Sequence, residues 1–158
     1  MDGAPDQPKG VTAGTTSDGK LALLLSAEWF DRIRMEVARL ARETPTTDLF
    51  VLVETYRRSP PAPTLFGDGV PGYRLEIENG EVRLSIGVTE ANRQADVEAT
   101  LDFQALRELV LLKVGPELEA RSAVYAAEGK LRMSGDVSRA PVDLVRLHDA
   151  LAACTLVE

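Results

Sequence analysis

Thiol and imidazole side chains are almost missing from this chain. Its 158 residues include one cysteine, Cys154, and one histidine, His148. A single cysteine excludes an internal disulfide and fits a reducing compartment. One histidine and one cysteine cannot complete a tetrahedral zinc site alone, and on one helix they would point about 120° apart, too far for a nucleophile–base pair. We therefore expect no metal and no cofactor, and interpret His148 as an exposed or half-buried helix residue.

Long apolar runs and an excess of basic residues are also missing. No stretch approaches the roughly 18 apolar residues of a membrane span, and the opening MDGAPDQPKG has no apolar signal core. The chain has 25 acidic and 18 basic residues, a net charge of −7, whereas nucleic-acid binding depends on neutralising phosphates. We expect a cytoplasmic protein with no nucleic-acid partner and no stable membrane insertion.

The residues that are present predict a short tail and one domain. Residues 1–20 are rich in Gly, Pro, Thr, Ser and Asp without periodicity, which predicts a flexible tail; residues 21–158 have the length of a single domain. Apolar spacing predicts a helix from Ser26, as N-cap, to Pro45, with Trp29, Phe30, Ile33, Val37, Leu40 and Ala41 on its buried face. Further helices are predicted over 103–113, 116–127 and 141–153, the first capped by Asp102.

Five strands are predicted, and the clearest pair is the hairpin YRLEIENGEVRLSIGV at 73–88. Asn79-Gly80 is the favoured dipeptide of a type I′ turn. This turn sets Ile77 opposite Val82, Leu75 opposite Leu84, Tyr73 opposite Ile86 and Glu76 opposite Arg83. The strand at 49–53 is apolar at every position, as in a strand covered on both faces, and a fourth strand follows at 95–101.

The fifth strand, at 130–134, comes after two helices. It cannot close a tight hairpin with the fourth strand, so its backbone groups must find partners by joining the sheet from a distance. We therefore predict an α+β, two-layer domain, with a five-stranded, mainly antiparallel sheet and helices packed on one face.

Catalytic motifs are weak. The string at 67–72 matches G-x-G-x-x-G, but a strand follows it where a dinucleotide site needs a helix. Asp96 and Glu98 alternate with apolar residues, which is typical of a solvated strand face. We expect no catalytic residues; an enzyme would need several titratable groups converging in one pocket.

Apolar residues at 106–114 exceed what one helix face needs against a sheet. Either neighbouring helices cover both faces, or part of this surface lines a cavity. The pattern leaves both open.

Several short motifs together resemble the sterol carrier protein type 2 (SCP-2-like) lipid-binding domain family. They are the hairpin at 73–80 with its glycine turn, Gly87, Ala95-Asp96-Val97, Thr100-Leu101-Asp102 and, above all, Gly129-Lys130-Leu131-Arg132-Met133-Ser134-Gly135-Asp136 before the last helix. The resemblance covers residues 26–153. The segment between the second helix and Gly129 is longer than in the family.

The resemblance implies a non-catalytic carrier with an apolar tunnel for a fatty acyl, sterol or phospholipid-like ligand between sheet and helices. From facing direction, the predicted lining is Leu106, Leu109, Val110, Leu131, Met133, Leu144, Leu147 and Leu151. The alternative is an interaction or accessory domain, a homodimer or a partner-protein complex, with a filled core and no ligand.

Overall fold

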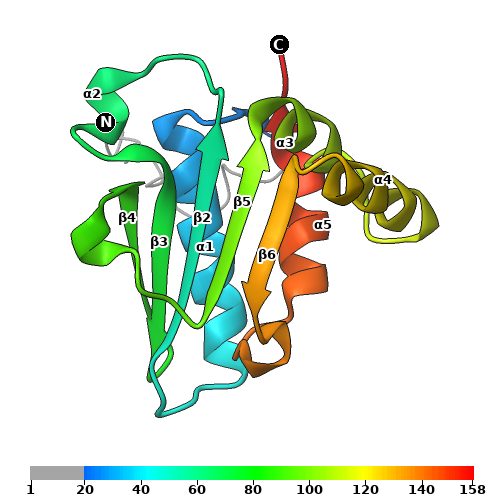
Figure 1. The fold of residues 1–158 in the computed structure, drawn as a ribbon. Coiled ribbons are helices and arrows are strands. Elements are labelled where there is room, and N and C mark those ends of the chain that lie inside the picture. The colour runs from blue at the N-terminus through cyan, green and yellow to red at the C-terminus, as the bar shows by residue number, and fades with distance from the viewer. Residues whose placement is uncertain (1–19) are drawn as a thin grey trace, which may run out of the picture.

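The computed structural model describes residues 20–158 and arranges them as a β-sheet with helices against one face (Figure 1). The predicted tail, apart from Lys20, lies outside the described residues. The strands are β1 (Ala22–Leu23), β2 (Phe50–Arg57), β3 (Val70–Glu78), β4 (Glu81–Val88), β5 (Val97–Asp102), β6 (Leu131–Gly135) and β7 (Thr155–Leu156). The helices are α1 (Ala27–Glu43), α2 (Pro63–Phe66), α3 (Phe103–Leu109), α4 (Pro116–Ala127) and α5 (Leu144–Cys154), with short 3₁₀ turns η1 (Glu90–Asn92) and η2 (Val137–Arg139).

The main sheet has the strand order β4-β3-β2-β5-β6. Its strands pair antiparallel except β2 and β5, which run parallel. The predicted α+β class and five-stranded, mainly antiparallel sheet are therefore confirmed. The late strand β6 pairs with β5 across the intervening α3 and α4, so it joins the sheet from a distance as predicted.

The hairpin of β3 and β4 has the predicted register. All four predicted cross-strand pairs are present, and Asn79 and Gly80 have φ values of 54° and 76°, as a type I′ turn requires. Glu76 and Arg83 form an ion pair of 3.0 Å. Turn chemistry and alternation are local properties, which is why the sequence sufficed here.

Helix α1 begins at its predicted cap. The hydroxyl of Ser26 accepts a hydrogen bond of 3.2 Å from the backbone N–H of Trp29. All six residues predicted for its inner face are buried.

Strand β2 is buried on both faces, as its unbroken apolar run predicted. Its Val51 and Val53 pack with Val88 and Ala95 on the face away from the helices. The other face of β2 meets the main core beneath α1.

The structure corrects two helix boundaries. Helix α3 ends at Leu109, not at residue 113, because α5 binds the groups that follow: Asp149 accepts from the N–H of Val114 at 2.8 Å, and His148 Nε2 lies 2.7 Å from the carbonyl of Leu112. Helix α5 begins at Leu144 rather than near residue 141, because the Asp143 carboxylate caps it by accepting from two backbone N–H groups.

The prediction that the side chain of Asp102 caps α3 is also wrong. Asp102 occupies the N-cap position, but its side chain makes no capping hydrogen bond. Its carboxylate lies 3.1 Å from the guanidinium of Arg57, a partner on a neighbouring strand.

Two short strands and one short helix were not predicted. Strands β1 and β7 form a parallel two-residue pair that joins the two ends of the described chain, and α2 follows the proline-rich connection. The indole N–H of Trp29 donates to the hydroxyl of Thr155 at 3.0 Å and so ties α1 to β7. Elements this short carry no periodic pattern.

Candidate ligand-binding site

A cavity of about 290 Å³ lies between the sheet and the helices. That is about ten times the volume that one water molecule occupies in the liquid, whereas native cores contain few voids larger than a water. Strands β2, β5 and β6 form its floor, and α3, α4 and α5 form most of its roof. Its apolar lining is Trp29, Ile33, Leu52, Val97, Ala99, Leu101, Leu106, Leu109, Val110, Leu118, Leu131, Met133, Val137, Leu144, Leu147 and Leu151.

The structure brings together all eight residues predicted to line a tunnel. Leu106, Leu109, Val110 and Leu147 are buried, and Leu131, Leu144 and Leu151 are half-buried. Met133 is 59% exposed although it also lines the cavity, so the cavity reaches solvent beside β6. Whether these side chains bind a ligand stays a prediction.

The cavity exists because the roof is incomplete over β5 and β6. Helix α4 projects away from the edge of the sheet (Figure 1) and buries one residue, Tyr125. The segment 110–113, predicted as helix, leads instead to backbone groups of Leu112 and Val114 that hydrogen-bond to α5. Small Ala99 on the floor leaves the space between these layers open.

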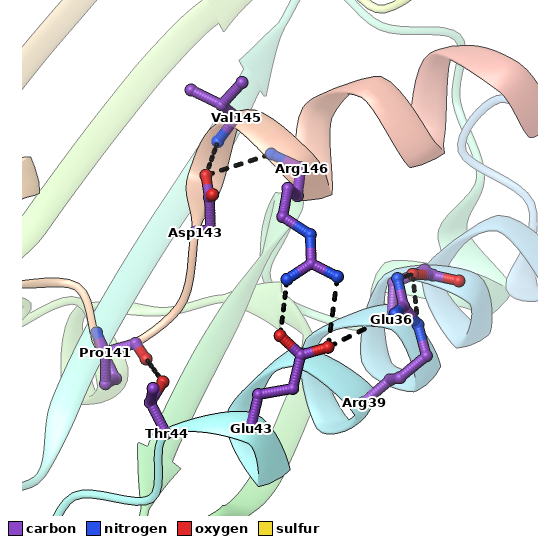
Figure 2. Close-up of polar contacts among 8 residues, drawn as sticks. All are labelled: Glu36, Arg39, Glu43, Thr44, Pro141, Asp143, Val145 and Arg146. Carbon is purple, nitrogen blue, oxygen red and sulfur yellow. Dashed lines mark hydrogen bonds and ion pairs between the residues drawn. The ribbon is translucent and has the colours of Figure 1, made fainter.

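Helix α5 supplies four lining residues, and side-chain contacts hold its beginning against α1 (Figure 2). Arg146 donates to both carboxylate oxygens of Glu43, at 2.5 and 3.2 Å. The hydroxyl of Thr44 donates to the carbonyl of Pro141 at 3.1 Å. These contacts join the C-terminal end of α1 to the roof of the cavity.

The Arg146 hydrogen bond, followed by the charges of Arg146 and Arg39, lowers the pKa of Glu43 below its ordinary value of 4.5. Both partners of the pair are about half exposed, at 47% and 46% of the side-chain surface. Solvent and salt therefore weaken this contact, and we assign it a modest share of the stability.

One acidic side chain, Glu54 of β2, lies in this apolar wall. It shares a strand face with Leu52 and Tyr56, the face that points to the helices. The hydroxyl of Tyr56 donates to Glu54 Oε1 at 2.8 Å, and that of Tyr73 donates to Oε2 at 3.3 Å.

Burial raises the pKa of Glu54 above its ordinary value of 4.5, and this effect exceeds the opposing hydrogen bonds from the two tyrosines and the charge of His148. Burial and the adjacent carboxylate also raise the pKa of Tyr56 and of Tyr73 well above 10.0. Both hydroxyls therefore keep their protons and act as donors to Glu54.

His148 lines the same cavity from α5 and is half-buried, within its predicted range. Its Nε2 is 2.7 Å from the carbonyl of Leu112, so this nitrogen carries a proton and donates it to that bond. The imidazole therefore serves first to hold the segment that follows α3.

Glu54 was not predicted from the sequence as a site residue. The predicted strand stopped at Val53, although the charged residue that follows has the same strand parity as Leu52 and therefore faces the core. An acid at a core-facing position of an otherwise apolar strand was the available signal.

Two surface hollows are larger than this cavity, about 410 and 450 Å³. The first contains three arginines, but Arg57 pairs with Asp102 and Arg93 with Glu98, both at 3.1 Å, so little positive charge is left uncompensated. The second lies among residues 23–25, 60–62 and the last residues of the chain. Neither lies between the sheet and its roof.

Within residues 20–158 no group of three or more His, Cys, Asp or Glu side chains is placed to hold a metal ion. In the same part of the chain, none of the helices has the length and apolar character needed to cross a bilayer.

No model of a known protein family matches the chain, and no curated protein matches its sequence. Several solved structures resemble its fold. A crystal structure of sterol carrier protein 2 is 15% identical, with a TM-score of 0.45, and the alignment covers 82% of this chain and 97% of that one.

A solution structure of palmitated SCP2L2 from Aedes aegypti is 19% identical with a TM-score of 0.43, covering 80% of this chain and 94% of that one. The UbiJ-SCP2 ubiquinone synthesis protein is 15% identical with a TM-score of 0.42, covering 77% and 94%. The structures similar to this chain thus include several sterol carrier proteins, the family that its motifs resemble. With every one of these TM-scores below 0.5, the functional proposal depends on the cavity.

Proposed function

We propose that this protein is a non-catalytic binding or carrier domain that holds an apolar small molecule, such as a fatty acyl, sterol or phospholipid-like compound, between its sheet and its helices. The observation that supports this most is the mainly apolar cavity of about 290 Å³ between the sheet and the helices. The aliphatic part of this cavity holds water poorly, because water needs polar partners. An apolar guest loses little there and gains about 0.8 kcal/mol for each methylene removed from water.

The volume limits the guest. Small-molecule sites occupy about 300–1,000 Å³, so this cavity is near the lower end. A short chain fits inside, and a longer molecule would extend past Met133, where the wall is exposed.

Two measurements test the proposal. The protein is purified without detergent and its organic extract analysed by mass spectrometry for co-purifying lipid; binding of the neutral apolar dye Nile red is then followed by fluorescence. We expect a co-purified apolar molecule or saturable dye binding. An empty protein that also fails to bind the dye would contradict the proposal.

The variant Ala99→Leu tests the location. The larger side chain occupies the floor of the cavity and displaces roughly three methylenes of a guest, which lowers dye affinity more than about tenfold. The matched control is Ala41→Leu, on α1 and outside the cavity wall, which should leave the affinity of the folded protein within about threefold of wild type.

The alternative, a protein interaction surface, is favoured by a different observation. Met133 and Val137 line the cavity and are 59% and 45% exposed, an apolar edge that a second chain could cover. Light scattering decides between them: a concentration-dependent dimer that excludes Nile red favours the interface, and a dye-binding monomer favours the carrier.

A further inference from the structure

Glu54 lies near the middle of the sheet, at the border of the cavity. In the sheet register it is opposite Tyr73 of β3 on one side and Ala99 of β5 on the other. Tyr73 packs against the ring of Phe30 and also lines the cavity, and Ala99 forms part of the cavity floor. The surface that Glu54 retains is therefore directed to the cavity, whose wall it helps to form.

The two tyrosines leave part of this carboxylate unused. A carboxylate has about four lone-pair sites, and each oxygen of Glu54 accepts one tyrosine hydroxyl. Within residues 20–158 the cavity wall contains no lysine or arginine. A guest would therefore meet acceptor capacity at Glu54 and no strong cation to receive an acid.

We infer that, if the cavity binds an apolar guest as proposed above, Glu54 selects guests whose polar head donates a hydrogen bond, such as an apolar alcohol or amine, and disfavours guests that end in a carboxylate. A hydroxyl or ammonium head completes the unused acceptor sites. A carboxylate head has no donor and brings a second negative charge into a poorly solvated site. The selection thus follows from the chemistry of the wall at Glu54, whereas the apolar body of the guest is held by the aliphatic wall.

A purely structural role for Glu54 makes a different prediction. If the carboxylate only satisfied the buried hydroxyls of Tyr56 and Tyr73, its replacement would change stability, and guests with different heads would bind in the same order as before. The order of affinities is therefore the informative measurement.

The ionisation of Glu54 should govern the selection. The titratable groups that act on it are Tyr56 on its own strand, Tyr73 on β3 and His148 on α5. The tyrosines stay protonated near neutral pH because burial raises the pKa of each hydroxyl. When the pH falls through the raised pKa of Glu54, its carboxylate becomes a neutral acid, and the discrimination against carboxylate guests should weaken.

The test uses three ligands with the same apolar chain: decanol, decylamine and decanoic acid. Each displaces Nile red from the full chain at a series of pH values that extends well above neutral, so that the ionised form of Glu54 is included. Because a hydrogen bond to a charged group is worth about a factor of ten or more in affinity, we expect decanol and decylamine each to bind at least about tenfold more tightly than decanoic acid. If only decylamine binds more tightly than decanoic acid, its positive charge explains the preference. If decanol also binds more tightly than decanoic acid, the hydrogen bond that both heads donate explains it.

The variant Glu54→Gln then assigns the preference to this side chain. We expect the ratio of the affinity for decylamine to the affinity for decanoic acid to fall at least about tenfold. The main reasons are that the amine binds less tightly and the acid binds more tightly. Glu98→Gln is the control: Glu98 lies on the other face of the sheet, paired with Arg93, and the ratio should not change.

The outcomes separate this inference from the carrier proposal. The wild-type protein alone tests the selection, so this result does not depend on whether a variant folds. Equal affinities for the three ligands would overturn the selection and leave the carrier proposal standing. A tighter-binding decanoic acid would do the same. Failure of Nile red and all three ligands to bind would overturn the carrier proposal, and the selection with it.

Discussion

The two halves of the sheet have the same helical cover in outline and very different interiors. Over β3 and β4, the ring of Phe30 meets those of Trp29, Phe66 and Tyr73 edge to face, with centroids 5.1, 6.0 and 6.0 Å apart. Over β5 and β6 the wall is mostly aliphatic, with Trp29 and Tyr73 at its border, and it lines the cavity of about 290 Å³, which is open to solvent. Large rigid rings fill the first interface, whereas a small floor residue and a shortened α3 leave the second interface open.

This contrast shows how one domain can combine stability with an internal site. The aromatic half supplies a dense core with rings in favourable edge-to-face geometry. The aliphatic half is less closely packed, and a guest would occupy the space that this leaves. If the two halves differ in energy as they differ in packing, the same substitution should have different effects in each.

The largest difference in stability should come from replacing one leucine by alanine in each half. Leu75→Ala, at a position 1% exposed in the aromatic half, should lower the free energy of unfolding by about 4 kcal/mol, because close-packed neighbours cannot collapse into the gap. Leu109→Ala, in the cavity wall, should cost only about 2 kcal/mol, because one side of Leu109 already lacks partners. Urea unfolding of both variants measures the difference, and equal losses would show that the cavity half is packed as well as the other.

Enlarging a small residue should change the stability of the protein in opposite directions in the two halves. Ala41→Leu, at a position 1% exposed on the buried face of α1, should destabilise the protein by about 1–3 kcal/mol through overcrowding. Ala99→Leu, on the cavity floor, should stabilise the ligand-free protein by about 0.5–2 kcal/mol by filling space. Thermal unfolding of delipidated protein gives both signs; a loss of stability at Ala99 would mean that the space is not available to a side chain.

Glu54, at the border between the halves, should reduce stability when it is charged. Because burial raises its pKa above 4.5, the folded state binds more protons than the unfolded state between 4.5 and the raised value, and stability from this group falls as the pH rises through that window. Glu54→Gln stays neutral, so it should be more stable than wild type at neutral pH, and the advantage should disappear as the pH falls below about 4.5.

Urea unfolding across this pH range measures that advantage, with Glu98→Gln as a control on the opposite sheet face. A difference between Glu54→Gln and wild type that does not change with pH would mean that burial of the charge is not its cause.

The smallest effect should come from the exposed contact between α1 and α5. Glu43→Gln removes the ion pair with Arg146. The pKa of Glu43 is lowered, so its contribution is present above 4.5 and is lost as the pH falls through the still lower folded value. We expect a slight loss of stability at neutral pH that high salt abolishes, measured by thermal unfolding at two salt concentrations; a loss that survives high salt would point to packing instead.

Local patterns predicted much of the aromatic half. The Asn79-Gly80 turn set the hairpin register, and Ser26 set the start of α1, because both depend on neighbours within a few residues. The eight predicted lining residues also share one cavity, since helix residues that face the sheet and strand residues that face the helices meet between the two layers.

The boundaries of the cavity could not be predicted in the same way. Helix α3 stops early because Asp149 and His148 of α5, far along the chain, bind the backbone after it. Asp102 turns from its helix to Arg57 on the neighbouring strand. Glu54 gains its significance from Tyr73, which another strand places against it.

The sequence by itself determined the class of the fold, the hairpin, and which side chains face the sheet, because alternation, helical spacing and turn chemistry act over short distances. The tertiary structure alone decided that the layers over β5 and β6 stay apart and that a carboxylate lies at the edge of the resulting space. The physical reason is that the volume between layers depends on how far apart whole elements pack, and no short stretch of sequence determines that distance.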